Sequence, residues 1–210
     1  VIGAGISNRP LIRLLCQAGI VPTVCDRAET LHPELEGLSL RTSLGAGYLA
    51  HLDADVIFRT PGLHPDAEPL RAARQAGALV TSEMEVFFKL CPCRTIAVTG
   101  SDGKTTTTSL IAEMLRAAGR TVYLGGNIGT PLLTKTPEMK PDDLAVLELS
   151  SFQLHSMSCS PDVAVITNLA PNHLDVHPSY QDYVDAKKQI FFHQRPDAVL
   201  VLNADNADTA

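Results

Sequence analysis

Short apolar runs alternate with amphipathic segments along the whole chain. Apolar runs bounded by glycine, proline or polar residues are typical of buried strands, and apolar residues at helical spacing predict the helices between them. Several helical segments stop at a glycine, and one begins at a capping serine, Ser82. The predicted strands are 1–2 (the end of one strand), 23–25, 56–58, 78–80, 95–99, 121–124, 145–149, 163–167 and 198–202. The predicted helices are 11–18, 69–76, 83–90, 105–118 and 180–192.

This alternation predicts an α/β protein in which helices cover parallel sheets. The segment CPCR at 91–94 is a candidate joint, because strand and helix start to alternate again after it. We therefore predict two α/β domains, residues 1–92 and residues 93–210. Since the chain stops at NADNADTA, just after a predicted strand, we expect the second domain to be incomplete.

Composition and charge limit the kinds of partner that we expect for this chain. Of the 210 residues 45% are hydrophobic and 19% are charged, a globular balance, and the net charge is -6 with no block of lysine and arginine. We therefore expect no nucleic-acid partner and no membrane partner, the latter also because no apolar run is long enough to span a bilayer. The five cysteines are irregularly spaced, and the close pair Cys91 and Cys93 cannot complete a tetrahedral zinc site alone. We interpret them as free thiols of a reducing cytoplasm.

The stretch AVTGSDGKTTTTSL at 97–110 carries the clearest chemistry. A strand that turns through a glycine loop into a helix presents backbone N–H groups and the helix dipole to a phosphate. Lys104 can then reach the outer phosphates of ATP and Thr105 can ligate Mg²⁺. The pattern is G-x-x-G-K-T, shorter than the commonest phosphate loop, because Val98 stands where that loop has its first glycine. The alternative is a polar helix start with a solvated lysine.

On this interpretation the second domain is a P-loop-type α/β ATPase. The predicted nucleotide-binding residues are Gly100, Ser101, Asp102, Gly103, Lys104, Thr105 and Thr106.

Two further side chains follow strands of the same predicted domain. Glu148 ends the strand LAVLE and His173 lies after the next strand, so both belong to the carboxyl edge of the sheet, where ligands bind in such folds. Oxygen ligands suit Mg²⁺, which favours Thr105 and Glu148. Histidine is a less usual magnesium ligand, and His173 is equally well interpreted as a loop residue or a cap.

The front domain begins with GAGIS, which gives it a Rossmann-like character. It lacks the full G-x-G-x-x-G pattern because Asn8 occupies the place of the third glycine. Asp26 at the end of the second strand does not restore that pattern, so the evidence for a dinucleotide cofactor is weak.

The segments TGSDGKTTT, NIGTP, LELSSFQL and TNLAPNHLD together resemble the Mur ligase family. The family consists of cytoplasmic enzymes that build the peptide of bacterial peptidoglycan by ATP-driven amide formation. Within it, VIGAGISNRPL, LELSSFQL and HLDVHPSYQDYVDAKKQIF are similar to the member that joins D-glutamate to UDP-N-acetylmuramoyl-L-alanine through an acyl phosphate. The resemblance covers essentially the whole chain but not the family's C-terminal domain, and we expect a monomer.

The resemblance also implies a second magnesium site. In the family, the glutamate and histidine that match Glu148 and His173 bind Mg²⁺ together with a carbamylated lysine, which by position is Lys187. A free ammonium group would be repelled there, whereas a carbamate supplies an oxygen ligand. Lys188 is adjacent, but neighbouring helix positions point about 100° apart and only one can face the site. The resemblance thus implies catalytic roles for Lys104, His173 and Lys187, and Asn172 stands where the family often has an aspartate.

The remaining implied residues contact the sugar-nucleotide substrate. Asn127 can equally be a turn residue between glycines, and Ser150 and Gln153 can equally line a sheet edge. The implied substrate residues are Ile6, Ser7, Asp26, Arg27, Thr60, Pro61, Gly62, Asn127, Ser150 and Gln153.

Other functions stay open at this point. The chain can be another Mur-type ligase, such as the L-alanine-adding member, or a folylpolyglutamate-type ligase. It can also be a nucleotide-binding module without catalysis, and we expect the 210 residues alone to bind the UDP-sugar weakly without turnover. A simple phosphate-loop kinase explains neither NIGTP nor NHLD.

Overall fold

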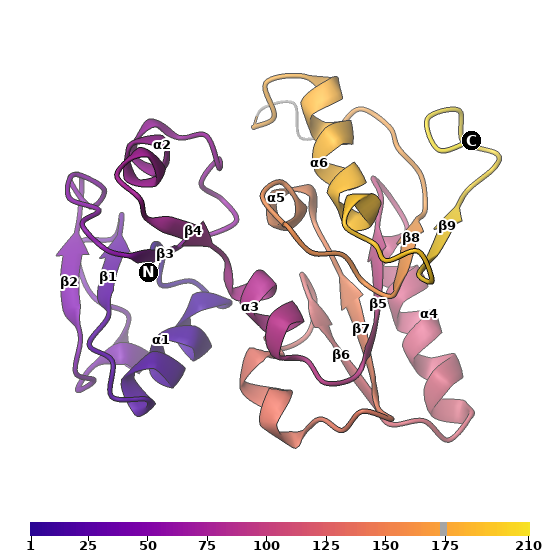
Figure 1. Cartoon of the computed structure of the whole chain (residues 1–210), viewed down its shortest axis with the longest axis horizontal. Helices are drawn as coiled ribbons and strands as arrows, with labels where there is room; N and C mark the ends of the chain where they lie inside the picture. Colours follow the sequence, from indigo (N-terminus) through magenta and orange to yellow (C-terminus); the bar gives the residue numbers. More distant parts are fainter. Residues whose placement is uncertain (173–175) are drawn as a thin grey trace. The chain divides into compact units, whose positions relative to one another are not determined.

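The computed structural model describes residues 1–172 and 176–210, and the chain divides into two compact units, Val1–Val86 and Phe87–Ala210. The division falls inside one helix, α3 (Glu83–Leu90), six residues before the joint expected from the sequence. Figure 1 shows helices and strands alternating through both units, as the sequence pattern predicts.

The first unit is built from parallel strand pairs joined through Ile2. β1 pairs with β2 and β3 pairs with β4, all parallel. Ile2 forms a parallel bridge with Cys25 of β1, and its N–H donates to the carbonyl oxygen of Phe58 at 2.8 Å, so it links the two pairs. The elements are α1 (Asn8–Gln17), β1 (Thr23–Asp26), a 3₁₀ turn η1 (Pro33–Leu35), β2 (Arg41–Leu44), β3 (Val56–Phe58), α2 (Glu68–Gln75), β4 (Leu79–Thr81) and the start of α3.

Alternate residues of these strands enter two apolar clusters. One cluster contains Ile57 with Leu70 and Ala73 of α2, and the other contains Val24 with Ile12 of α1. Because successive side chains of a strand point to opposite faces, one helix packs on each face of the sheet. The loops at the carboxyl ends of the strands are thereby held between two packed helices.

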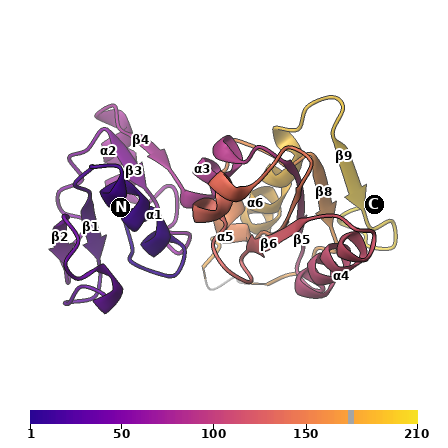
Figure 2. The ribbon, with the colours of Figure 1, turned by 90° about the horizontal axis from the view of Figure 1, so that it is seen from below.

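The second unit contains a five-stranded parallel sheet in the order β6-β7-β5-β8-β9. β7 is buried at every position, as expected for a central strand covered on both faces. α4 packs against β5, β6 and β7, α6 packs against β5 and α5, and Figure 2 shows α4 on one side of the sheet with α5 and α6 on the other. The elements are the end of α3, β5 (Arg94–Thr99), α4 (Lys104–Ala117), β6 (Val122–Gly126), a 3₁₀ turn η2 (Leu133–Glu138), β7 (Leu144–Glu148), α5 (Ser151–Leu154), β8 (Val163–Ile166), α6 (Tyr180–Phe192) and β9 (Val199–Leu202).

The sequence analysis did not predict one strand and one short α-helix. β2 (Arg41–Leu44) is a half-exposed edge strand with polar residues, so it lacks the apolar run that marks a buried strand. α5 (Ser151–Leu154) is a single turn, too short for helical periodicity. By contrast, β3 and α6 have the bounds that the sequence predicts. No helix within residues 1–172 and 176–210 combines the length and the apolar character needed to cross a membrane.

Arg59 holds the loop that follows β3. Its side chain is buried, and Nη1 donates to the carbonyl oxygens of Thr60, Pro61 and Leu63 at 3.1, 3.0 and 2.6 Å. Burial lowers the pKa of Arg59 to about 10, an effect that Glu85 opposes and Arg74 reinforces. No local pattern distinguishes this arginine from a surface one, so its role could not be predicted from the sequence.

We expect Arg59→Ala to lower the free energy of unfolding by about 2–4 kcal/mol, because three partly buried carbonyl groups lose their donor and a cavity remains where the buried side chain was. Urea titration followed by circular dichroism measures the change. The matched control is Arg71→Ala on the exposed side of α2, which should stay within about 0.5 kcal/mol of the parent. Equal stabilities of the two variants would contradict the role of Arg59.

Candidate functional site

The loop between β5 and α4 has a shape that only glycine permits at its first position. Gly100 has φ +147°, and a side chain there would collide with Thr167 Oγ1 and with the backbone of Asn168. Gly103 caps α4 with φ +75°, in the left-handed region. The chain can therefore turn sharply from the end of β5 into Lys104, the first residue of the helix.

The loop is anchored to the segment that follows β8. The N–H of Ser101 donates to the carbonyl oxygen of Asn168 at 2.9 Å, and Thr167 Oγ1 donates to the carbonyl oxygen of Asp102 at 2.6 Å. Ser101 Oγ also lies 2.9 Å from the hydroxyl of Tyr183 on α6. The first amides of α4 have no acceptor within the helix and carry the positive end of its dipole, an arrangement that favours a bound phosphate.

Glu148 lies beside this loop because of strand register. It pairs with Val98 across β7 and β5, and its side chain is only 2% exposed. Glu148 Oε2 accepts the hydroxyl of Thr105 at 2.6 Å, and Oε1 accepts Asn127 Nδ2 at 3.0 Å. The structure thus brings together three residues expected at the site, with two of the oxygen donors that Mg²⁺ prefers already adjacent.

Lys187 projects from α6 onto the same loop. Its Nζ donates to the carbonyl oxygen of Gly100 at 2.8 Å and to Thr99 Oγ1 at 3.3 Å, and it lies 4.7 Å from the centre of the Tyr183 ring. The residue is 1% exposed. Burial, followed by repulsion from Lys104, lowers the pKa of Lys187 to about 7, and attraction to Glu148 opposes the shift.

The neighbouring lysines are arranged differently. Lys188 lies at the surface, 3.5 Å from Asp185 Oδ1, so of the adjacent pair only Lys187 faces the loop. Lys104 folds back, and its Nζ donates to the carbonyl oxygen of Ser101 at 2.8 Å. Two amines therefore converge on the loop next to the buried carboxylate of Glu148, an arrangement whose charge suits a polyphosphate.

The other expected residues of the second unit have definite places, with one exception. Ser150 and Gln153 form a capping box at the start of α5: Gln153 N–H donates to Ser150 Oγ at 3.3 Å and Ser150 N–H donates to Gln153 Oε1 at 3.0 Å. Thr106 is exposed in the first turn of α4, and Asn172 is exposed after β8. His173 lies outside the described residues. Substrate contacts of Ser150 and Gln153 stay a prediction.

A buried cluster that the sequence analysis did not identify ties α5 to α6. His177 Nδ1 lies 2.6 Å from Asp182 Oδ2 and His177 Nε2 lies 2.9 Å from Ser151 Oγ, while His155 Nε2 lies 3.1 Å from Asp182 Oδ1. The His177 ring stacks on Phe152 with centroids 5.4 Å apart. Since α6 carries Lys187, this cluster positions the amine. Ser151 and His177 are far apart in sequence, so no local motif announces it.

In the first unit, the expected substrate residues gather at the carboxyl edge of the strands. Asp26 accepts the N–H of Ala4 at 2.6 Å and that of Ala28 at 2.9 Å, which fixes the GAGIS loop beside the end of β1. A side chain at Gly3 would lie 3.0 Å from Thr60 Cβ, so the same loop borders the segment after β3. At this edge lie Ile6 (68% exposed), Ser7, Arg27, Pro61 and Gly62.

The contacts of Asn8 explain why the segment that begins with GAGIS departs from the G-x-G-x-x-G pattern. Its Nδ2 donates to the carbonyl oxygens of Ile2 at 2.9 Å and Gly3 at 3.1 Å, and its side chain is buried in the first turn of α1. The asparagine thus occupies the space where a third glycine would leave room for close approach of a dinucleotide. This contact favours a structural role for Asn8.

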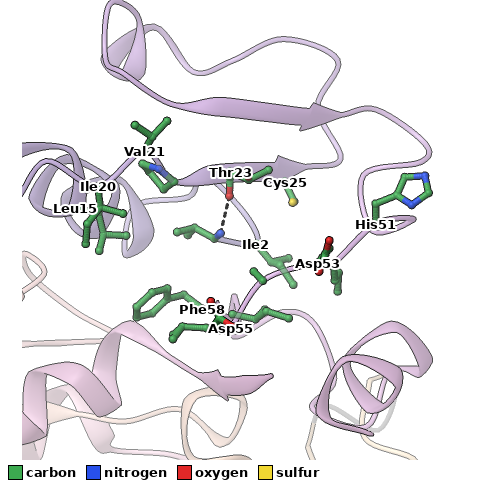
Figure 3. Close-up of a pocket in the computed structure, with 16 residues that line it drawn as sticks. Ile2, Leu15, Ile20, Val21, Thr23, Cys25, His51, Asp53, Asp55 and Phe58 are labelled. Carbon is green, nitrogen blue, oxygen red and sulfur yellow. Dashed lines mark hydrogen bonds between the residues drawn. The ribbon is translucent and has the colours of Figure 1, made fainter. Parts of the chain in front are cut away.

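An apolar slot of about 530 Å³ lies at the opposite edge of the first unit, where β1 and β3 begin. Figure 3 shows Ile2, Leu15, Ile20 and Phe58 around it, with the amino group of Val1 donating to the carbonyl oxygen of Thr23 at 2.7 Å. Asp26 is the last residue of β1, and Thr60 comes after the last residue of β3. Both therefore lie at the carboxyl ends of these strands, and the slot is separate from the candidate substrate edge.

Comparisons with known proteins agree with this arrangement. The profile of the Mur ligase middle domain matches residues 98–210, more than half of the chain. The UDP-N-acetylmuramoylalanine--D-glutamate ligases of Acetivibrio thermocellus and Ruminiclostridium cellulolyticum are 53% and 54% identical over 98% and 100% of this chain. The chain spans 46% of the length of each of these curated relatives.

Solved structures support the fold. The UDP-N-acetylmuramate:L-alanyl-gamma-D-glutamyl-meso-diaminopimelate ligase of Neisseria meningitides aligns over 99% of this chain and 71% of its own length, with a TM-score of 0.60 and 21% identity. The UDP-N-acetylmuramate-alanine ligase of Thermotoga maritima aligns over 99% of this chain and 49% of its own, with a TM-score of 0.54 and 22% identity. At these identities the likeness shows a shared α/β architecture.

The lowered pKa of Lys187 predicts a pH dependence of stability. The unfolded chain holds this proton up to the ordinary pKa of 10.5, whereas the folded chain releases it near 7. Between these values the unfolded state binds more protons, so the free energy of unfolding rises with pH through this window, by on the order of 3–5 kcal/mol from this group.

Denaturant titrations from pH 6.5 to 10 in CO₂-free buffer measure this contribution as the difference between the parent and Lys187→Met. We expect the parent to gain stability relative to Lys187→Met as pH rises, because the variant has no proton to lose. Lys188→Met serves as the surface control and should follow the parent. Parallel curves for the parent and Lys187→Met would show that the amine titrates normally.

Proposed function

Because this chain belongs to the Mur ligase family, we propose that it is the part of an enzyme that adds D-glutamate to UDP-N-acetylmuramoyl-L-alanine in an ATP-dependent reaction. The observation that carries the proposal is the meeting of Thr105, Glu148 and Lys187 at the loop of Lys104. The choice of D-glutamate rests on the two relatives at 53% and 54% identity that bear this activity in their names. As a step of peptidoglycan precursor synthesis, the reaction belongs to the cytoplasm, and we propose a monomer.

The residues around the loop fit a Mg–ATP complex. The amides of the loop and the first turn of α4 bind the phosphates, and Lys104 turns from the Ser101 carbonyl to the outer phosphates. Thr105 Oγ1 and Glu148 Oε2, 2.6 Å apart, are both oxygen donors of the kind that Mg²⁺ requires. When bound, Mg²⁺ offsets negative charge on the phosphates and helps to align them.

Lys187 supplies a further oxygen ligand after it reacts with CO₂. A buried amine with a pKa of about 7 is largely neutral at cytoplasmic pH, and only the neutral form is a nucleophile. A bond forms between Nζ and the carbon of CO₂, one N–H proton leaves to water, and a carbamate anion results. The change from cation to anion also removes the repulsion between Lys187 and Lys104.

The reaction then proceeds in two displacements. A carboxylate oxygen of UDP-N-acetylmuramoyl-L-alanine attacks the γ-phosphorus of ATP, and ADP leaves to give an acyl phosphate. The amine of D-glutamate attacks the acyl carbon, phosphate leaves, and the amine loses a proton as the amide forms. Lys104 and the amides of α4 stabilise charge on the transferring phosphoryl group, in keeping with catalysis by positioning and electrostatics.

The first unit binds the UDP portion of the substrate on this proposal. Ile6 and Ser7 of the GAGIS loop contact the diphosphate and uracil, Asp26 and Arg27 contact the uracil, and Thr60–Gly62 lie beneath the nucleotide. Asn127 contacts the muramoyl and diphosphate portion, and Ser150 and Gln153 line the substrate pocket. His173, which lies outside the described residues, completes the metal ligands with Glu148.

The ligase assay measures phosphate release from ATP by the full-length enzyme. Release should require UDP-N-acetylmuramoyl-L-alanine and D-glutamate together, and L-alanine with UDP-N-acetylmuramate should not replace them. Lys104→Met and Glu148→Gln should each lower kcat by about 10²–10³-fold, since each removes a charge that acts on the transferring phosphoryl group. Lys188→Met is the control and should keep parental turnover. Phosphate release by folded enzyme without either substrate would exclude the proposal.

The carbamate has a separate spectroscopic test. After equilibration with ¹³C-bicarbonate, the parent should give a ¹³C carbamate carbonyl resonance that disappears in acid. Lys187→Arg should lack the resonance, because a guanidinium stays protonated, and Lys188→Arg should retain it. A resonance that is unchanged in Lys187→Arg would place the modification on another lysine.

A further inference from the structure

Three sulfur atoms meet at the beginning of β5, in the second unit. Cys91 Sγ lies 3.4 Å from Cys93 Sγ and 3.9 Å from Met139 Sδ. Cys93 and Met139 are each 6% exposed, and Cys91 is half-buried. The proposed ligase reaction uses none of these residues, because the phosphate loop lies at the other end of β5.

We propose that Cys91, Cys93 and Met139 form a binding site for a soft monovalent metal ion, Cu(I). Thiolate and thioether sulfur are the ligands that select Cu(I) over harder ions. An ion about 2.3 Å from each sulfur would subtend angles of about 95° at the two thiols and about 115° at Cys91 and Met139, near the range of three-coordinate geometry. The two printed separations, Cys91 to Cys93 and Cys91 to Met139, are therefore both short enough for a shared ion.

The surroundings favour a soft ion over zinc. Zinc requires a fourth ligand, usually from cysteine, histidine or a carboxylate. Within residues 1–172 and 176–210, no histidine, aspartate or glutamate forms a compact group of three ligands with the two thiols. The third donor is the thioether of Met139, which zinc sites rarely use and Cu(I) accepts.

Burial, the hydrogen bond with Cys91, the Cys91 sulfur and the Asp143 carboxylate raise the pKa of Cys93 to about 12. Because a cysteine sulfur binds a metal as the thiolate, Cu(I) competes with this proton. Binding forms three Cu–S bonds and releases the two thiol protons to water, with no change in the oxidation state of copper or sulfur.

The site has an approach from solvent and a stable frame. A polar cavity of about 610 Å³ is lined by Cys91 and Cys93 together with Thr95, Asp162 and Arg195. Cys91 N–H donates to the carbonyl oxygen of Phe87 at 2.8 Å, which fixes the start of the pair on the end of α3. Met139 directly follows η2, and its N–H donates to the carbonyl oxygen of Thr136 at 3.2 Å.

A disulfide is a poorer interpretation of the same pair. The sulfur atoms would have to move from 3.4 Å to about 2.05 Å, the length of a disulfide bond. Metal coordination needs no such approach of the two sulfurs.

The test is a copper competition titration. The chain, reduced and kept anaerobic, receives Cu(I) as its bicinchoninate complex, and loss of the colour of that complex reports transfer to protein. We expect one equivalent per chain, and X-ray absorption should show sulfur ligands only. Cys91→Ser and Cys93→Ala should each weaken binding by at least about 100-fold and Met139→Leu by about tenfold, since each removes one ligand.

Cys16→Ser is the matched control, because Cys16 is also a half-buried free thiol but belongs to the first unit, and it should bind copper as the parent does. Circular dichroism checks that each variant is folded, and Cys91→Ser, at the less buried position, carries the conclusion if Cys93→Ala unfolds. Parental affinity in folded Cys91→Ser, nitrogen or oxygen ligands in the absorption spectrum, or oxidation of the pair to a disulfide without copper uptake would each overturn the proposal.

Discussion

The position of β5 between β7 and β8 is the constraint on which the rest of the second unit depends. Register against β7 places Glu148 beside Val98, and register against β8 places Ile166 beside Thr99. The loop that leaves β5 therefore has Glu148 on one side and the backbone of Asn168 on the other. Because Gly100 is packed against that backbone, the loop can turn into α4 only if this residue has no side chain.

Charge at the site follows from the same geometry. One buried carboxylate, Glu148, lies near two amines, Lys104 and Lys187, and the sheet and α6 keep water away from Lys187. Loss of the Lys187 proton relieves both the desolvation and the repulsion from Lys104, whereas conversion of the amine to an anion replaces that repulsion by attraction. The proposed carbamate and the proposed phosphate ligand both bring negative charge to a place where the two amines lie.

In the first unit, buried and half-buried side chains hold the backbone of the loops at the carboxyl edge of the strands. Asp26, Asn8 and Arg59 each form side-chain hydrogen bonds with backbone groups at this edge. These loops are thus shaped before any substrate arrives, which reduces the entropy lost on binding. The exposed Ile6 and Arg27 lie on this edge.

Local patterns predicted most of the strands and helices and the glycine loop before α4, because turn chemistry and periodicity act over a few residues, but they missed β2 and α5. The spacing of GSDGKTT places Lys104 at a helix start, and the phase of α6 separates Lys187 from Lys188. Only the tertiary structure decided the contacts that no local pattern indicates: Glu148 with Asn127, His177 with Ser151, and Cys91 with Met139. The reason is that strand order and crossover connections set these distances, and neither leaves a trace in the residues that surround each position.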